Sequence, residues 1–317
     1  MNKLTLAVLV SSLVLGGCGS TPKSTSNEVD TNKERALIIS STENYIWQND
    51  ESVAYNIAKL AQPSGVGIGM RDNADPKNDN MGRSGSSALS AVSGFLMGGF
   101  GGTASFLAMD SKNDSLRDWN PSFVTFYDEM DLDLSDPVKA NKIVREDLSK
   151  NIAKALLQEY PDTKLEGVFS YKSPDVPISA IAVLSGNICN MARDFGKLDL
   201  KYGNDYEQRF KTFTAENTSD IDGQCFFTFE SKVSGKLKNK IAVVSELGGY
   251  NVNVFIANNA ANNFEDGFII FPDRFKYIVF GSQTKHYYPY PSPVVIGNGK
   301  RYFLDISEMS SSEDLAF

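Results

Sequence analysis

The sequence predicts an α+β fold, in which an α/β half is followed by an antiparallel β-rich half. Strand-like and helix-like patterns alternate between residues 34 and 185, which is typical of an α/β segment. From residue 223 onward, short β-type runs follow one another and are separated by Gly, Asn and Pro, which indicates a meander or a small β-sandwich. Aromatic residues make up 11% of the chain, so it has enough large side chains for a packed core.

The first residues have the order of an export signal. Asn2 and Lys3 are polar, the run from Leu4 to Leu15 is uncharged and mostly apolar, and small residues follow it. At about a dozen residues, the apolar run is too short to span a bilayer permanently. We therefore interpret residues 1–17 as a signal peptide that is removed on export.

The residues that close this signal, Leu15-Gly16-Gly17-Cys18, resemble the lipobox of bacterial lipoproteins. The resemblance implies that Cys18 is the first residue of the mature chain and that it carries palmitate and other acyl chains. Several acyl chains anchor a protein stably, because each buried methylene contributes roughly 0.8 kcal/mol. Gly19 follows rather than Asp, which in Gram-negative lipoproteins implies delivery to the outer membrane.

Residues 18–33 are rich in Ser, Thr and Asn and predict a flexible tether between the lipid and the folded body. The body begins at residue 34 with a β-type run at residues 36–39. A helix is expected at residues 50–62, because Asp50 is suited to its N-cap and Pro63 stops it. Residues 66–70 predict a short strand.

Residues 84–109 contain no charged side chain. Small residues recur every fourth position in this glycine-rich segment, as in helices that associate closely or insert into a membrane. A mobile loop or a buried packing segment is the alternative, because each glycine costs a helix about 1 kcal/mol relative to Ala. The ridge of small residues comprises Ser86, Ser90, Gly94, Gly98 and Gly102.

The rest of the α/β half predicts one long helix and several strands. Asp136 is suited to the N-cap and Pro137 to the first position of a helix over residues 138–159. Apolar residues alternate with Asp131 and Asp133, which predicts a strand with one wet face. The expected strands of this half are residues 122–126, 130–134, 167–171 and 178–184.

The β-rich half comprises residues 186–310. No element is predicted between residues 187 and 222, and the boundary between the two halves is placed in this stretch. Residues 311–317 form a short tail. The strands expected in this half are residues 225–233, 240–246, 250–257, 267–271, 277–280, 294–296 and 301–306.

Once Cys18 is assigned to lipid, Cys189 and Cys225 are the remaining cysteines of the chain. In an exported protein an even pair of cysteines is expected to form a disulfide. Neither cysteine has a C-x-x-C partner, so a structural bond is favoured over a redox or nucleophilic role.

The chain has no recognisable catalytic signature. The carboxylates of Asp131 and Asp133 are the best candidates for acid-base work, but a glycosidase needs two carboxyls on opposite sides of the substrate. His286 is the only histidine, so a histidine-rich metal site is excluded, and the sequence contains no G-x-S-x-G elbow of the kind that hydrolases use. We assign no cofactor, no metal and no catalytic residue.

An aromatic loop, Tyr287-Tyr288-Pro289-Tyr290-Pro291, stands out near the C-terminus. Alternating prolines fix an extended backbone, and exposed tyrosines provide contact area at low entropy cost. The loop is interpreted either as a recognition loop contacting a partner through Tyr287, Tyr288 and Tyr290, or as a stiff connection between strands.

The formal net charge of −8 argues against nucleic acid as a partner, because an acidic surface repels phosphate backbones. Together these features predict an outer-membrane lipoprotein with a non-enzymatic structural or protein-interaction role in an envelope assembly for secretion, conjugation or surface exclusion. Its expected partners are the membrane, through the anchor, and envelope proteins or further copies of itself. The order of lipobox, α/β segment and glycine-rich stretch is similar to that of surface-exclusion lipoproteins of conjugative plasmids.

Two other functions remain open from the sequence. One is a periplasmic hydrolase of glycan or peptidoglycan that uses carboxylates such as Asp131 and Asp133. The other is a periplasmic module that binds a small molecule against the β-rich half.

Overall fold

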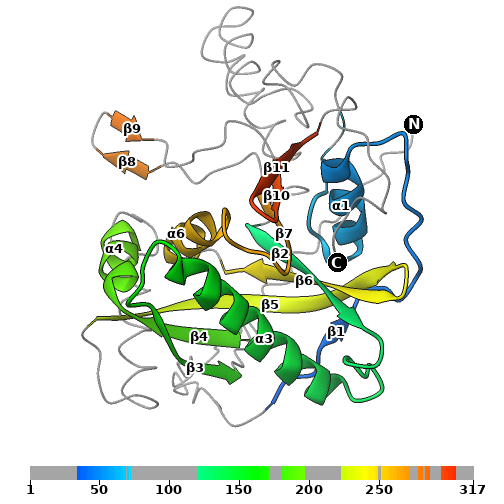
Figure 1. The fold of residues 1–317 in the computed structure, drawn as a ribbon, viewed down its shortest axis with the longest axis horizontal. Coiled ribbons are helices and arrows are strands. Elements are labelled where there is room, and N and C mark those ends of the chain that lie inside the picture. Colours follow the sequence, from blue (N-terminus) through cyan, green and yellow to red (C-terminus); the bar gives the residue numbers. More distant parts are fainter. Residues whose placement is uncertain are drawn as a thin grey trace, which may run out of the picture.

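The computed structural model describes residues 34–68, 70, 72, 120–170, 180–196, 223–248, 251–271, 278–280, 283–285 and 294–304 (Figure 1). The predicted signal peptide, the tether, the glycine-rich segment 84–109 and the tail 311–317 lie outside the described residues.

The fold is α+β, as predicted, and is organised around one nine-stranded sheet with the order β11-β10-β7-β2-β6-β5-β4-β3 (Figure 1). The ninth strand, β1, pairs in parallel with β5, whereas the other pairs are antiparallel. The strands of this sheet are β1 (Ile38–Ile39), β2 (Ser122–Asp128), β3 (Lys164–Ser170), β4 (Ala180–Ser185), β5 (Gln224–Leu237), β6 (Lys240–Leu247), β7 (Gly267–Phe271), β10 (Val294–Gly297) and β11 (Lys300–Phe303).

Strands from both sides of the expected boundary at residue 186 belong to this sheet. Strand β4 pairs with β5, and β2 lies between β6 and β7. The boundary therefore does not separate two sheets, and the expectation of a separate meander or sandwich is wrong for these strands. Strands β8 (Ile278–Phe280) and β9 (Gln283–Lys285) form a separate hairpin.

Helices cover both faces of the sheet (Figure 1). On one face, α3, α4 and α6 pack over a core that includes Phe123, Phe227 and Phe229. On the other face, α1 packs over a core that includes Val124 and Val244. Phe123 and Val124 are adjacent in β2, so the alternation of a strand sends one side chain to each layer. The helices are α1 (Val53–Ala61), η1 (Gln62–Ser64, a 3₁₀ turn), α3 (Pro137–Leu157), α4 (Asn187–Gly196) and α6 (Asn251–Ala260).

Helix α1 forms where a helix was predicted, but its N-cap is Ser52 rather than Asp50. The Ser52 hydroxyl accepts a hydrogen bond from the Tyr55 N–H at 3.1 Å, which satisfies one of the free donors of the first turn. The helix ends before Pro63, which lies in the η1 turn. The helix is thereby fixed at both ends close to its predicted limits.

Helix α3 starts at Pro137, after an Asp136 N-cap, as the sequence predicts. The Asp136 carboxylate accepts a hydrogen bond from the Lys139 N–H at 3.0 Å, and Pro137 is the first helical residue. Val144, Leu148 and Ile152 are fully buried against the sheet, at the spacing of one helix face.

The strand predicted at residues 130–134 is wrong. Strand β2 ends at Asp128, and the N–H groups of Asp131 and Leu132 donate to its carbonyl at 2.9 and 3.1 Å, which closes a turn. Leu132 is buried beside the start of α3, whereas Met130 is 95% exposed. The alternating pattern therefore arises from a turn that leads into a helix.

The strand predicted at residues 66–70 is wrong for its described residues, which form a turn closed by a hydrogen bond from the Met70 N–H to the Gly67 carbonyl. The strand predicted at 250–257 is also wrong, because helix α6 occupies this part of the chain. Val252, Ile256 and Ala260 recur every fourth residue and are all buried in the core, so the true period is helical.

Strand β5 contains a β-bulge near Gly235. Val233 pairs with Val243, but Gly235 pairs with Ala242, so β5 has one extra residue at this point. Gly235 has φ +153°, a conformation that L side chains rarely adopt, and a Cβ there would lie 3.1 Å from the Glu43 carbonyl oxygen. The bulge sets the register of the rest of the hairpin.

Candidate functional site

The predicted interaction residues lie outside the described residues. This holds for the lipidation site Cys18, for the ridge of small residues from Ser86 to Gly102 and for the aromatic loop of Tyr287, Tyr288 and Tyr290. Cys189 and Cys225 are therefore the predicted site residues that the structure places.

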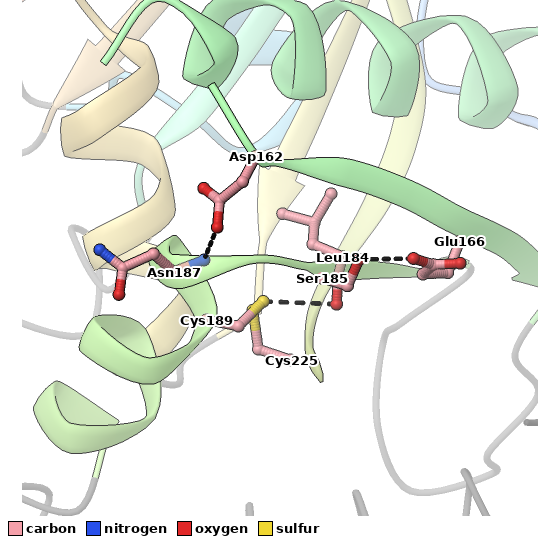
Figure 2. Close-up of a disulfide and its surroundings, with 7 residues drawn as sticks. All are labelled: Asp162, Glu166, Leu184, Ser185, Asn187, Cys189 and Cys225. Carbon is pink, nitrogen blue, oxygen red and sulfur yellow. Dashed lines mark hydrogen bonds between the residues drawn. A yellow bond between two sulfur atoms is a disulfide. The ribbon is translucent and has the colours of Figure 1, made fainter. Parts of the chain in front are cut away.

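The predicted disulfide between Cys189 and Cys225 is confirmed, with an S–S distance of 2.09 Å and a Cα–Cα distance of 5.0 Å (Figure 2). Both cysteines are fully buried. The bond joins α4 to the start of β5, next to the end of β4. Its burial favours a structural role, because thiol exchange requires access of an attacking thiolate to the sulfur.

Polar contacts fix the start of α4 beside this disulfide (Figure 2). The Asn187 N–H donates to the Asp162 carboxylate at 2.8 Å, and the Ser185 hydroxyl donates to the Glu166 carboxylate. A carboxylate at a helix N-terminus is favourable because free N–H groups and the helix dipole face it. These contacts hold Cys189 in position against β5.

The carboxylates of Asp131 and Asp133 are both exposed in the turn after β2. The Ser135 side chain and backbone N–H stabilise the charged form of Asp133 and lower its pKa. A general acid requires the opposite shift. The lowered pKa therefore argues against Asp133 as the general acid of such a pair.

A different pair of carboxylates, which the sequence analysis missed, lies on the α1 face of the sheet. Glu230 of β5 and Glu246 of β6 are direct cross-strand neighbours, and Glu230 is only 8% exposed. Two like charges opposite each other destabilise a sheet unless other groups compensate them. The surrounding residues supply this compensation.

Cations and amide donors surround the pair. Glu230 lies 3.2 Å from the Lys232 ammonium and 3.9 Å from the Arg35 guanidinium. Glu246 Oε1 accepts hydrogen bonds from the Asn120 backbone N–H at 2.9 Å and from its side-chain amide at 3.3 Å. Burial raises the pKa of Glu246, and the charge of Glu230 adds to this, while Asn120 and Lys232 oppose it. The site can hold a proton or a carboxylate charge in a largely dry environment.

We expect Glu246→Gln to stabilise the protein at pH 7 and to leave its stability at pH 4 nearly unchanged. Because the pKa of Glu246 is raised, the folded protein binds the proton more tightly, and stability falls as pH rises from the usual glutamate range through the folded pKa. The amide keeps an acceptor for the Asn120 N–H. Urea unfolding at both pH values measures the effect, and exposed Glu43→Gln is the control. Equal stability of wild type and Glu246→Gln at pH 7 would contradict it.

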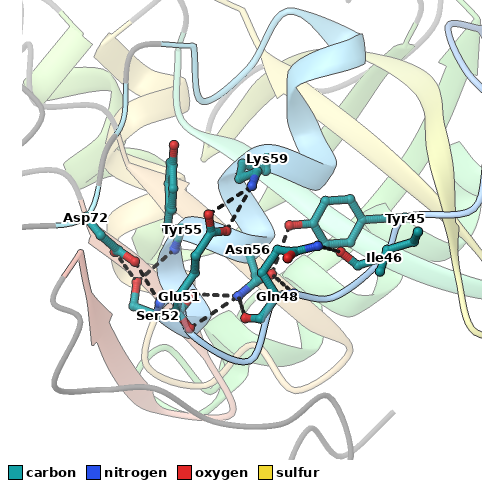
Figure 3. A network of polar contacts seen from close by, with 9 residues as sticks. All are labelled: Tyr45, Ile46, Gln48, Glu51, Ser52, Tyr55, Asn56, Lys59 and Asp72. Atoms are coloured by element: carbon teal, nitrogen blue, oxygen red, sulfur yellow. Dashed lines mark hydrogen bonds and ion pairs between the residues drawn. The ribbon is translucent and has the colours of Figure 1, made fainter.

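A second polar network fixes the segment before α1 (Figure 3). The fully buried Asn56 amide donates to the carbonyls of Gln48 and Ser52 at 2.9 and 3.0 Å, and its oxygen accepts from the Gln48 N–H and the Tyr45 hydroxyl, both at 2.9 Å. At the helix start, the Ser52 N–H donates to the Asp72 carboxylate at 2.7 Å. Each partner is polar and partly or fully buried, so the network is structural.

Hydrogen bonds and an ion pair hold the first described residues against α3. Arg145 is 3% exposed and forms a two-pronged ion pair with Glu34, whose pKa is lowered by this contact. The Asn141 amide donates to the Arg35 carbonyl at 2.9 Å, and the Leu37 N–H donates to the Pro137 carbonyl at 2.7 Å. These contacts hold residues 34–37 against α3.

Within the described ranges, no group of three His, Cys, Asp or Glu side chains is arranged to hold a metal ion. None of the described helices is long and apolar enough to cross a membrane. Comparisons with protein-family models, curated proteins and solved structures found no match to this chain.

Proposed function

We propose that this protein is an outer-membrane lipoprotein that acts by protein contacts in an envelope assembly and is not an enzyme. The lipobox-like Leu15-Gly16-Gly17-Cys18 supports the anchor. In this proposal, acylated Cys18 holds the chain in the membrane, residues 18–33 are the tether, and the folded sheet and helices are the part that partners contact.

The observation that carries the proposal is the buried disulfide between Cys189 and Cys225. Disulfides persist in exported proteins and are rare in the cytosol, where thioredoxin and glutathione keep thiols reduced. A disulfide in the folded body and an export signal at the N-terminus are independent features of the chain. Both features favour a location on the outer side of the inner membrane.

The ion pair between Glu34 and Arg145 supports the proposed arrangement of tether and body. Releasing Glu34 leaves the buried Arg145 guanidinium without its counter-ion, which is strongly unfavourable. A pull transmitted through the tether therefore acts on α3 directly.

Substituting the acylated residue tests the anchor. We expect Cys18→Ala to lose incorporation of labelled palmitate and to move from the outer-membrane fraction to another fraction. The double variant Cys189→Ala/Cys225→Ala is the control and is expected to keep its label. Wild-type protein without acyl groups, or recovered from the cytosol with free thiols, would contradict the proposal.

The proposed contact role is tested on the ridge of small residues. We expect Gly94→Leu and Gly98→Leu to change the oligomeric state or the crosslinked partners of the full-length protein in detergent, because a large side chain separates closely packed helices. Ala104→Leu, in the same uncharged segment but off the ridge, is the control. An unchanged state in both glycine variants would remove the ridge from the proposal.

A hydrolase is the second candidate function, and the Glu230 and Glu246 pair is the observation that favours it. Neighbouring carboxylates in unlike environments are the arrangement that acid-base catalysis uses. The pair already has Lys232 and Arg35 as counter-ions, so we prefer the first proposal. Hydrolysis of purified peptidoglycan by wild type, and its loss in Glu230→Gln and Glu246→Gln with folding retained, would reverse this preference.

A further inference from the structure

A second acidic cluster lies on the opposite face of the sheet, beneath α3. Tyr127 of β2 packs with Ala140 and Val144 of α3 and is only 8% exposed. Its hydroxyl meets the geometry of a hydrogen bond with no residue in the described part of the chain. Leaving a buried hydroxyl without a partner costs about 1 to 3 kcal/mol. The position therefore favours a group that is able to interact with it.

The charges of two carboxylates from different parts of the chain, Asp147 and Asp266, act on this hydroxyl. Asp147 lies one turn beyond Val144 on α3. Asp266 directly precedes Gly267, the residue that pairs with Thr125 of β2, so Asp266 lies at the same end of β2 as Tyr127. An ion pair of 3.0 Å between Lys154 and Glu265, the neighbour of Asp266, holds this end of the loop against α3.

Two lysines of α3 also act on the cluster: Lys150 on Asp147, and the exposed Lys154 on both Glu265 and Asp266. Burial raises the pKa of Asp147, and Asp266 raises it further, whereas the Tyr127 hydroxyl and Lys150 lower it. Burial and the charges of Asp147 and Asp266 likewise raise the pKa of the Tyr127 hydroxyl. Two carboxylates therefore act on a buried hydroxyl that has no hydrogen bond by distance and angle among the described residues, and a bound cation would give all three groups a common partner.

We propose that Asp147, Asp266 and the Tyr127 hydroxyl bind a hydrated divalent cation, Mg²⁺ or Ca²⁺. Both ions prefer oxygen ligands, and Mg²⁺ in particular is held in proteins by one or two carboxylates with several retained waters. Two carboxylates and a phenol leave most positions to water. The affinity is therefore weak, with a dissociation constant on the order of 10⁻⁴ to 10⁻³ M. The cation would connect α3 to β2 and to the start of β7.

Thermal unfolding and calorimetric titration of the full mature chain, with its disulfide intact, test this site. We expect MgCl₂ or CaCl₂ to raise Tm along a saturating curve, beyond the effect of NaCl at equal ionic strength. At a concentration of ten times Kd, the unfolding constant falls about tenfold. An equal response to NaCl would overturn the proposal, and the two divalent salts tell which ion binds more tightly.

Neutral variants distinguish this cluster from other acidic positions. We expect Asp147→Asn and Asp266→Asn to abolish the rise of Tm that MgCl₂ or CaCl₂ causes beyond NaCl. Both variants are expected to fold, because each removes repulsion between the two carboxylates. Tyr127→Phe is expected to weaken this rise. Asp131→Asn, in the exposed turn after β2, is the matched control and keeps the full response. A response in Asp147→Asn or Asp266→Asn equal to that of wild type would contradict the site. This test does not depend on the lipid anchor.

Discussion

Replacing Cys189 and Cys225 together by alanine is expected to lower the free energy of unfolding by about 4 kcal/mol. The two cysteines are 36 residues apart, so the bond strongly restricts the unfolded chain. Both side chains are fully buried between α4 and β5, so the native state also loses packing when they shrink. Urea unfolding followed by circular dichroism measures the change as a lower midpoint.

Two controls separate the disulfide from other effects of the substitution. Cys18→Ala removes the one cysteine that takes no part in the disulfide and is expected to leave the midpoint unchanged. Wild-type protein unfolded in a strong reductant is expected to approach the stability of the double variant. Equal midpoints for oxidised and reduced wild type would show that the bond does not stabilise the fold.

Elements with strong local signals could be predicted from the sequence. The start of α3 has an Asp cap, a proline at the first helical position and apolar residues at helical spacing, and the structure follows all three. The disulfide was also predictable, because two cysteines remain after one is assigned to lipid. Such signals depend on neighbouring residues or on composition, and distant contacts do not alter them.

The wrong strand predictions arise where tertiary contacts decide whether apolar residues follow the period of a strand or the period of a helix. Residues 250–257 combine apolar and β-branched residues, which suggests a strand, but Val252 and Ile256 are buried together on one side of α6. At residues 130–134, Leu132 is buried by the start of α3, which lies later in the chain. Short apolar runs fit either period, so the packing partners determine the outcome.

The carboxylate pair was not predictable for a related reason. Glu230 and Glu246 become neighbours because the bulge near Gly235 adds one residue to β5. Without the bulge, the hairpin turn would place Ser231 opposite Glu246. A register shift of one residue changes every cross-strand neighbour, and Gly235 marks a place where a bulge can form without showing from the sequence alone that one does. The cluster of Tyr127, Asp147 and Asp266 was hidden because its members come from three separate elements.

Replacing Asn56 by alanine is expected to lower the free energy of unfolding by about 3 kcal/mol, because it leaves several buried backbone and side-chain groups without hydrogen-bond partners. The amide is 0% exposed and connects α1 to Gln48 and Tyr45 in the preceding segment (Figure 3). We expect this segment to loosen first, with faster amide hydrogen exchange at Gln48 than at Leu37, which α3 holds separately. Exposed Asn44→Ala is the matched control. A change below about 1 kcal/mol in Asn56→Ala would show that water replaces the amide, and that the network does not fix the segment.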